Sequence, residues 1–157
     1  MRESLKAGVS FGLTSGIITT LGLMVGLHSG THSRIAVLSG ILTIAIADAF
    51  SDALGIHISK ESESRHTVRE IWLSTLFTFL SKFVFASSFI VPILVFRLST
   101  AVVVAVVWGL SLLGGYSFLL ARAEKVRAWP VIAEHVGIAV AVILLTHGLG
   151  SLLPRIL

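Results

Sequence analysis

Hydrophobic residues are concentrated in five long runs along the chain, and short polar segments separate these runs. The runs cover residues 8–27, 35–58, 71–96, 98–121 and 131–153. A helix needs about 20 apolar residues to cross the hydrocarbon core of a bilayer, and each run has that length. None of the runs alternates between polar and apolar residues, as the strands of a membrane β-barrel do. The pattern predicts an all-α integral membrane bundle of five transmembrane helices, in a single transmembrane domain over residues 1–157.

The composition agrees with a membrane protein and argues against several other classes. Of the 157 residues, 55% are hydrophobic and 13% are charged, and the mean hydropathy is +0.96. A soluble domain has about a quarter of its residues charged. The chain has no cysteine, so it forms no disulfide and no thiolate metal site. No nucleophile and base lie at a spacing suited to catalysis, so we do not expect an enzyme.

Basic residues lie at the ends of the runs and predict the orientation of the chain. One side carries Arg2, Lys6, Lys60, Arg65, Arg69, Arg122, Lys125 and Arg127, and the other carries Arg34, Arg97 and Arg155. Because cytoplasmic loops carry an excess of Lys and Arg, we expect a cytoplasmic N-terminus and a C-terminus outside or in a lumen. The same positions make the pI of about 10.1 a membrane-surface signal, with lipids rather than nucleic acid as partners.

The segment 59–70, between the second and third runs, is the longest connection and is rich in charged residues. It is either a helical extension of the second span or a plain solvated loop, and we expect the loop.

Three charged residues lie near the centre of the predicted spans, where each charge costs roughly 2.5 to 3.5 kcal/mol on insertion. Asp48 and Asp52 are four residues apart on the second span, so their side chains project from one helical face. Lys82 lies on the third span at a similar depth, about ten to twelve residues from the same end as the aspartates. The small and polar residues expected to line a pathway beside them are Ser15, Gly16, Thr19, Ser51 and Gly55.

The three charges allow two interpretations. In the first, Lys82 and one aspartate form an intramembrane ion pair that locks the second and third helices together. That pair leaves the other aspartate unexplained. A carboxylate without a counter-ion in lipid favours its neutral, protonated form, which a proton-carrying site requires. We therefore favour a cation and proton pathway in which Asp48, Asp52 and Lys82 carry transport and proton coupling.

Glycines on the first span give a weaker signal. Gly12 with Gly16, and Gly22 with Gly26, form small-xxx-small pairs that let helices approach closely, within a protomer or across a dimer axis.

The six histidines include no HExxH or other fixed ligand pattern. His57 is nearest to the aspartates and is a candidate metal ligand. His28 and His32 are expected in the first outward loop, and His147 in the outer half of the fifth span.

The first two spans read FGLTSGIITTLGLMVG and ILTIAIADAFSDALGIHISKESE. Together they resemble the vacuolar iron transporter family, also called nodulin-21-like. Its first helix has the form G-x-x-D-G-x-x-T-x-x-G and its second A-D-x-x-S-M-x-x-G-[DE]-[YF]-x-S. The matching positions are Gly12, Gly16, Thr19, Gly22 and Gly26 on the first helix, Ala47, Asp48, Ser51, Gly55 and Ser59 on the second, and Glu61 and Glu63 beyond it. The rest of the chain matches in hydropathy, span count and orientation.

The resemblance implies a homodimer with its path at the dimer interface, which exports Fe²⁺, and often Mn²⁺, from the cytoplasm in exchange for protons. The metal is then the transported substrate, and no tightly bound cofactor is expected. Asp48 and Asp52 would bind the metal, with His57, Glu61 and Glu63 as further candidate ligands. The membrane would be the plasma membrane in a prokaryote and a vacuolar-type membrane in a eukaryote.

The chain departs from the family pattern at several positions. The acidic residue of the first helix is Ser15 here, the methionine is Asp52, and the acid after Gly55 is Ile56. Lys82 is outside the pattern, and the acidic helical domain between the second and third spans is missing. Exchanging a thioether for a carboxylate makes a harder site, which favours Mn²⁺ or Mg²⁺. The alternatives are a changed cargo, such as another cation, or a non-transporting structural or partner subunit.

Overall fold

The computed structural model describes residues 2–156 and consists of helices joined by short loops. Five helical spans are long and apolar enough to cross a membrane, which confirms the predicted all-α bundle. The first span is α1 (Arg2–Thr31), and the second comprises α2 (Arg34–Thr43), the π-helix η1 (Ile44–Asp48) and α3 (Ala49–Ser62). The third comprises α4 (Val68–Ser88) and α5 (Ile90–Val95), and the fourth and fifth are α6 (Leu98–Ala123) and α7 (Ala128–Ile156).

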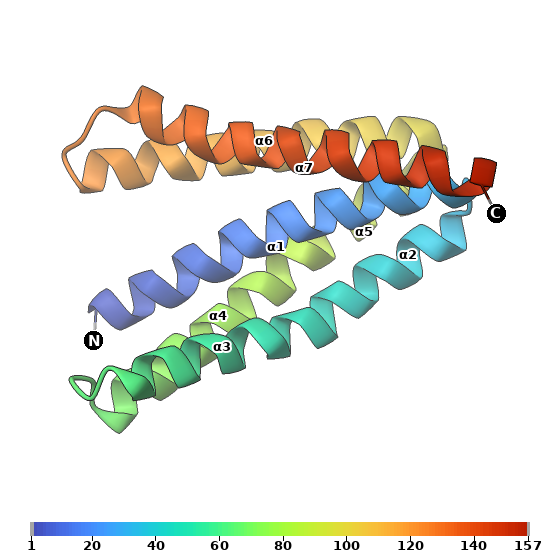
Figure 1. Cartoon of the computed structure of the whole chain (residues 1–157). Coiled ribbons are helices and arrows are strands. Elements are labelled where there is room, and N and C mark those ends of the chain that lie inside the picture. The colour runs from blue at the N-terminus through green and yellow to red at the C-terminus, as the bar shows by residue number, and fades with distance from the viewer. Residues whose placement is uncertain (1, 157) are drawn as a thin grey trace.

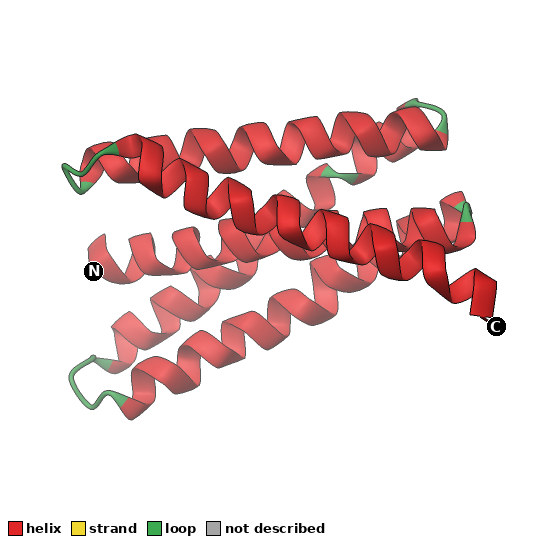
Figure 2. Cartoon of the chain, turned by 45° about the horizontal axis from the view of Figure 1, so that its top comes forward, coloured by secondary structure: helices red, strands yellow, loops and turns green. Residues whose placement is uncertain are grey.

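The first span lies in the middle of the bundle (Figure 1). The antiparallel pair α6 and α7 lies on one side of α1, and α3 and α4 lie on the other. The loops that join one span to the next gather at the two ends of the bundle, as Figure 2 shows, and a further green segment away from the ends marks a break within the third span. The two ends of the chain lie at opposite ends of the bundle, as an odd number of spans requires.

Each span is longer than its predicted apolar run, because the helices continue through polar residues at their ends. Helix α1 begins at Arg2, and α7 continues to Ile156. The loop expected over residues 59–70 is correspondingly shorter, since α3 continues to Ser62. Thr67 starts α4 with a capping box, in which its hydroxyl oxygen accepts from the Glu70 N–H and the Glu70 carboxylate accepts from the Thr67 N–H.

The single helix expected over residues 71–96 is interrupted at Phe89, between α4 and α5. Pro92 accounts for the break, because proline has no N–H for the carbonyl of Ser88 and its ring crowds that carbonyl. The side chain of Phe89 is completely buried at the break. The outer end of the third span is thus a separate short helix that packs on α6.

Glycines of α1 set the distances to two neighbouring helices. Gly12 and Gly16 face α4, and an added Cβ at Gly16 would lie 3.2 Å from the Cα of Lys82. Gly22 and Gly26 face α7, and an added Cβ at Gly26 would lie 3.4 Å from the Cβ of Thr146. Both predicted small-residue pairs therefore pack within the protomer.

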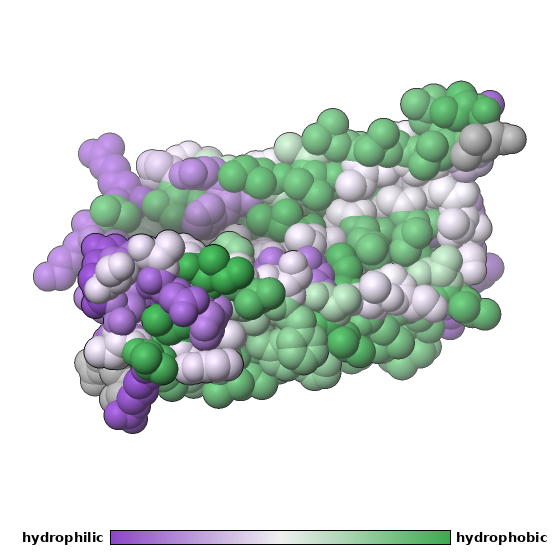
Figure 3. All heavy atoms as spheres, turned by 60° about the horizontal axis from the view of Figure 1, so that its bottom comes forward, coloured by the Kyte–Doolittle hydropathy of each residue, from purple (hydrophilic) through white to green (hydrophobic). Residues whose placement is uncertain are grey.

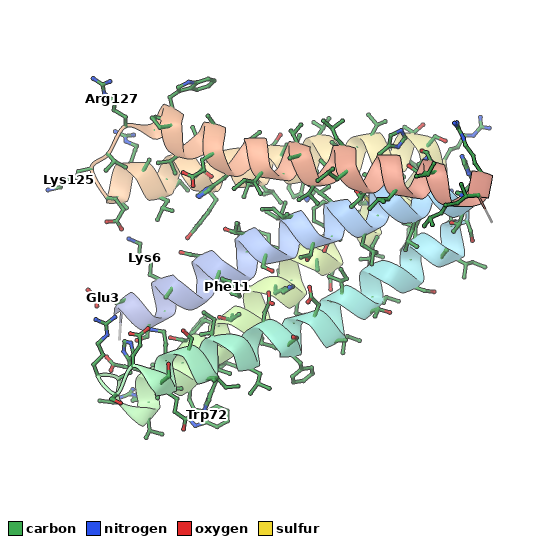
Figure 4. All side chains as sticks on the ribbon, in the orientation of Figure 1. Glu3, Lys6, Phe11, Trp72, Lys125 and Arg127 are labelled. Carbon is green, nitrogen blue, oxygen red and sulfur yellow. The ribbon has the colours of Figure 1, made fainter. Side chains whose placement is uncertain are left out.

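The outside of the bundle is mainly apolar. Leu144 and Leu145 of α7 are 64% and 68% exposed, and large apolar side chains are exposed on every span. Soluble monomers rarely expose such extensive apolar surface. Figure 3 shows hydrophilic residues crowded at the end that holds the N-terminus, and Lys6, Lys125 and Arg127 lie there in Figure 4. This distribution agrees with an integral membrane protein whose basic end is the one predicted to be cytoplasmic.

Candidate functional site

Lys82 lies near the middle of the third span and is completely buried, at 0% exposed. Its aliphatic stem packs against α1 at Gly16, where an added Cβ would lie 3.3 Å from the Lys82 Cγ. Gly16, expected to line a pathway, thus makes room for the lysine instead.

The Lys82 ammonium contacts three oxygens. Its Nζ lies 2.5 Å from an oxygen of Asp48 and 2.5 Å from an oxygen of Asp52. It also donates to the hydroxyl of Ser15 at 2.8 Å, so three partners match its three protons. Ser15 donates in turn to Asp52 at 2.6 Å. The structure thus brings together Ser15, Asp48, Asp52 and Lys82 from three spans, and we call these four residues the charged cluster.

The two carboxylates of the charged cluster differ in position and exposure. Asp48 is the last residue of the π-helix η1, and Asp52 lies in the first turn of α3. The π-helical segment could not be read from the sequence pattern, and such segments are frequent at functional sites. The Asp48 side chain is 35% exposed and the Asp52 side chain 19%. With one ammonium and two carboxylates, the cluster has a charge of minus one when all three groups are ionised.

Asp48 opens onto a shallow groove of about 530 Å³ on the outside of the bundle. Thr19, Thr43 and Ser51 line this groove beside Asp48. The Thr19 hydroxyl donates to the carbonyl of Ser15 at 2.8 Å, so it can offer only its oxygen lone pairs to the groove. Gly55 lies further along the span, and an added Cβ there would meet no atom within 4 Å. In Figure 3 a small hydrophilic area interrupts the hydrophobic surface near mid-length.

The groove belongs to an exposed row of small residues along the second span, spaced four apart. The row consists of Ser39, Thr43, Ala47, Ser51, Gly55 and Ser59. Sequence reasoning identified Ser51 and Gly55 but missed Thr43, and the four-residue spacing of the row was the signal that would have found it.

His57 lies away from the charged cluster. Its Nδ1 is 3.0 Å from the hydroxyl of Thr75, and its ring packs edge-on against Trp72 with the ring centroids 4.8 Å apart. The imidazole therefore helps to join α3 to α4, and the structure does not place it beside Asp48 and Asp52.

Glu61 and Glu63 lie at the basic end of the bundle and are exposed. The Arg65 Nε donates to Glu63 at 2.7 Å, and His66 lies 3.2 Å from the same carboxylate oxygen. These hydrogen bonds, with that from Arg65 the stronger, lower the pKa of Glu63. Over residues 2–156, no three His, Asp or Glu side chains are grouped to hold a metal ion. Of the five expected ligands, Asp48 and Asp52 lie together at Lys82, and His57, Glu61 and Glu63 do not join them within a protomer.

Three histidines gather at the opposite end of the bundle. His28 belongs to the last turn of α1 rather than to the expected loop, and His32 lies in the connection that follows. Both line a cavity together with His147 of α7. Sequence reasoning weighed these residues one at a time, and only the packing of α1 on α7 brings them together.

The chain matches no family model, and neither a curated protein nor a solved structure is similar to it. The resemblance to the vacuolar iron transporter family therefore stays a prediction that rests on the motifs of the first two spans.

Proposed function

We propose that the chain is a proton-coupled transporter of divalent metal cations, Fe²⁺ or Mn²⁺, that works as a homodimer and exports metal from the cytoplasm. The observation that carries this proposal is the charged cluster at mid-membrane depth, in which the Asp48 carboxylate is partly exposed. A purely architectural ion pair needs one carboxylate for Lys82, whereas two contact it here. In lipid the excess negative charge favours a bound proton or a second cation. An exchange of these two species is the chemistry of a cation–proton antiporter.

A second copy of the chain would cover the exposed carboxylate. The groove beside Asp48 faces outwards, and the exposed row of small residues along the second span allows another helix to approach closely. Of the most apolar stretch of each span, 22% is buried in the second, against 56% in the first and 11% in the fifth, so the second span has a free face, as the fifth also has. Two such faces would bring four carboxylates and two ammonium groups together. When all are ionised, their net charge is minus two, which one divalent cation balances.

In the proposed exchange, metal competes with protons and with Lys82 for the two carboxylates. Ser15 accepts from Lys82 and donates to Asp52, so its hydroxyl can turn to offer a lone pair when the ammonium moves away. Thr19 and Ser51 supply further neutral oxygens at the groove. Hard oxygen ligands of this kind suit Mn²⁺ and Fe²⁺. The basic end would face the cytoplasm, which sets the direction of export.

The test is uptake of Fe²⁺ and Mn²⁺ into proteoliposomes that carry a pH gradient. The Asp48→Asn/Asp52→Asn variant is compared with the parent, and Glu134→Gln serves as control because it removes an exposed carboxylate elsewhere in the bundle. We expect gradient-dependent flux in the parent and the control and none in the double variant, with all three eluting alike on size exclusion. No flux of either metal from well-folded parent protein would refute the proposal.

Two alternatives have observations in their favour. Lys82 joins three spans through its contacts, as a purely architectural centre would, and then the chain is a structural or partner subunit. In that case the double variant should disturb assembly. The charged cluster also lacks a third carboxylate, which favours a changed cargo such as a monovalent or organic cation. Flux assays with those ions separate this case from the first.

A further inference from the structure

A cavity of about 600 Å³ lies at the end of the bundle opposite the charged loops. It opens between the end of α1, the start of α6 and the end of α7. This position corresponds to the boundary between hydrocarbon and headgroups on the side predicted to be outside. The cavity lies at one end of the bundle, whereas the charged cluster lies near the middle of the spans, so the proposed transport chemistry does not account for it.

Every titratable side chain that lines this cavity is basic. These side chains are His28, His32, His147 and Arg155, and none of the described Asp or Glu residues joins them. Imidazole and guanidinium groups are hydrogen-bond donors, and Arg155 has no carboxylate partner among the described residues. The lining therefore presents donors and positive charge without an acid to balance them.

Two of the histidines show how the donors are arranged. The Nδ1 of His147 is 2.6 Å from the hydroxyl of Ser29, which fixes the ring at the cavity wall. The Nδ1 of His28 is buried and has no hydrogen-bond partner within the part of the chain that the structure describes. Because this nitrogen is buried, a ligand in the cavity reaches the rest of the His28 ring and the other lining side chains rather than Nδ1.

The start of α6 adds further donors. Arg97 is the N-cap of this 26-residue helix, and its side chain does not cap the backbone. The first N–H groups of the helix are therefore open to a ligand, and Ser99 of this first turn lines the cavity. Uncapped helix N-termini favour anions, because their free N–H groups and the helix dipole both attract negative charge.

From this arrangement we infer that the cavity binds a phosphate group. Arg155 supplies the permanent positive charge, while the imidazoles, the Ser99 hydroxyl and the start of α6 supply hydrogen bonds to phosphate oxygens. A transition metal fits less well, because the three histidines are not grouped around a common point and Arg155 repels a cation. The phosphate belongs either to the headgroup of a lipid in the adjacent leaflet or to a free phosphate ion.

The test measures phosphate binding by delipidated protein in detergent. Native mass spectrometry follows binding of phosphatidylglycerol and of diacylglycerol, which has the same tails but no phosphate. Phosphorus NMR titration with inorganic phosphate forms the second arm. We compare the parent with Arg155→Gln, which changes the cavity, and with Arg34→Gln, which removes the same charge at the same end but belongs to α2 and does not line the cavity.

We expect selective binding of phosphatidylglycerol, inorganic phosphate or both, weakened about tenfold or more by Arg155→Gln and changed less than about twofold by Arg34→Gln. Binding of the lipid alone identifies a headgroup site, and binding of the ion alone identifies a free-phosphate site. Equal binding of the two lipids with no response to phosphate would overturn the inference. Equal losses of phosphate affinity in both arginine variants would also overturn it. So would tight, histidine-dependent binding of Zn²⁺ by a protein that binds no phosphate. Should Arg155→Gln fail to fold, His32→Gln at the exposed rim gives the same comparison.

Discussion

Replacing Lys82 with methionine tests how much the charged cluster contributes to stability. Methionine keeps the length of the aliphatic stem but removes the ammonium that lies 2.5 Å from both carboxylates. The two carboxylates then repel each other in an apolar surrounding. Breaking a buried ion pair by removing one partner costs about 3 to 5 kcal/mol. Because Asp48 is 35% exposed and Asp52 19%, solvent reduces the penalty, and we expect the lower end of that range.

Thermal unfolding in detergent, followed by tryptophan fluorescence, measures the effect. For a chain of this size a loss of about 3 kcal/mol corresponds to a fall in Tm of roughly 6–12 °C. Lys60→Met is the matched control, since Lys60 lies at the polar end of α3 and should change stability by no more than about 0.5 kcal/mol. Adding Asp48→Asn and Asp52→Asn to Lys82→Met should restore most of the lost stability, because no like charges then remain.

A Tm of Lys82→Met within about 1 °C of that of the parent would refute the expected loss of stability, as would a triple variant no more stable than Lys82→Met alone. Either result would mean that the cluster is solvated or already protonated, and that its charges do not oppose each other in the folded protein.

Three further substitutions test the packing and capping of the helices by the same thermal assay. Gly150→Ala should destabilise the protein by about 1 to 3 kcal/mol, because the new Cβ meets the carbonyl oxygen of Gly26. Gly148→Ala is the control, since an added Cβ there meets open space and should be neutral or stabilising. Equal effects of the two substitutions would contradict the close packing of α1 on α7. Thr67→Ala removes the N-cap of α4 and should cost about 1 kcal/mol, while an unchanged Tm would show that the capping box is not formed. Phe89→Ala empties a fully buried position at the break in the third span and should cost about 3 to 5 kcal/mol, so a mild effect would place this side chain in lipid.

The number, type and order of the spans follow from hydropathy alone, because a segment that crosses lipid must satisfy its backbone internally and be apolar over its whole length. The exact ends of the helices do not follow from hydropathy, since polar helical turns such as residues 2–7 at the start of α1 have no apolar signature. The break at Phe89 did have a signal, namely Pro92 inside an apolar run. Hydropathy hides that signal, because proline interrupts hydrogen bonding rather than hydrophobicity.

The charged cluster was partly accessible to sequence reasoning. Depth along the spans placed Asp48, Asp52 and Lys82 at one level, and the structure joins them at 2.5 Å. The part that Ser15 plays between Lys82 and Asp52 depends on the rotation of α1, which the glycine contacts with α4 determine. The histidine cavity could not be predicted from the sequence, because His28 and His147 come from opposite ends of the chain and meet only through the packing of α1 on α7.

The π-helix η1 has a consequence for how the second span tolerates insertions and deletions. Five buried residues four apart, Val37, Ile41, Ala45, Ala49 and Ala53, line one edge of this span. In a regular α-helix each such step overshoots a full turn by about 40°, so the edge would wind through about 160° over its length. A turn of π-helix holds about one residue more than a turn of α-helix, so η1 offsets part of that winding. Removing a single residue from positions 44–47 would therefore leave an ordinary α-turn and keep Asp52 near Lys82. Removing one residue from positions 49–51, in the α-helix that follows, would instead turn Asp52 by about 100° and carry it away from Lys82, although every side chain of the site would still be present in the sequence.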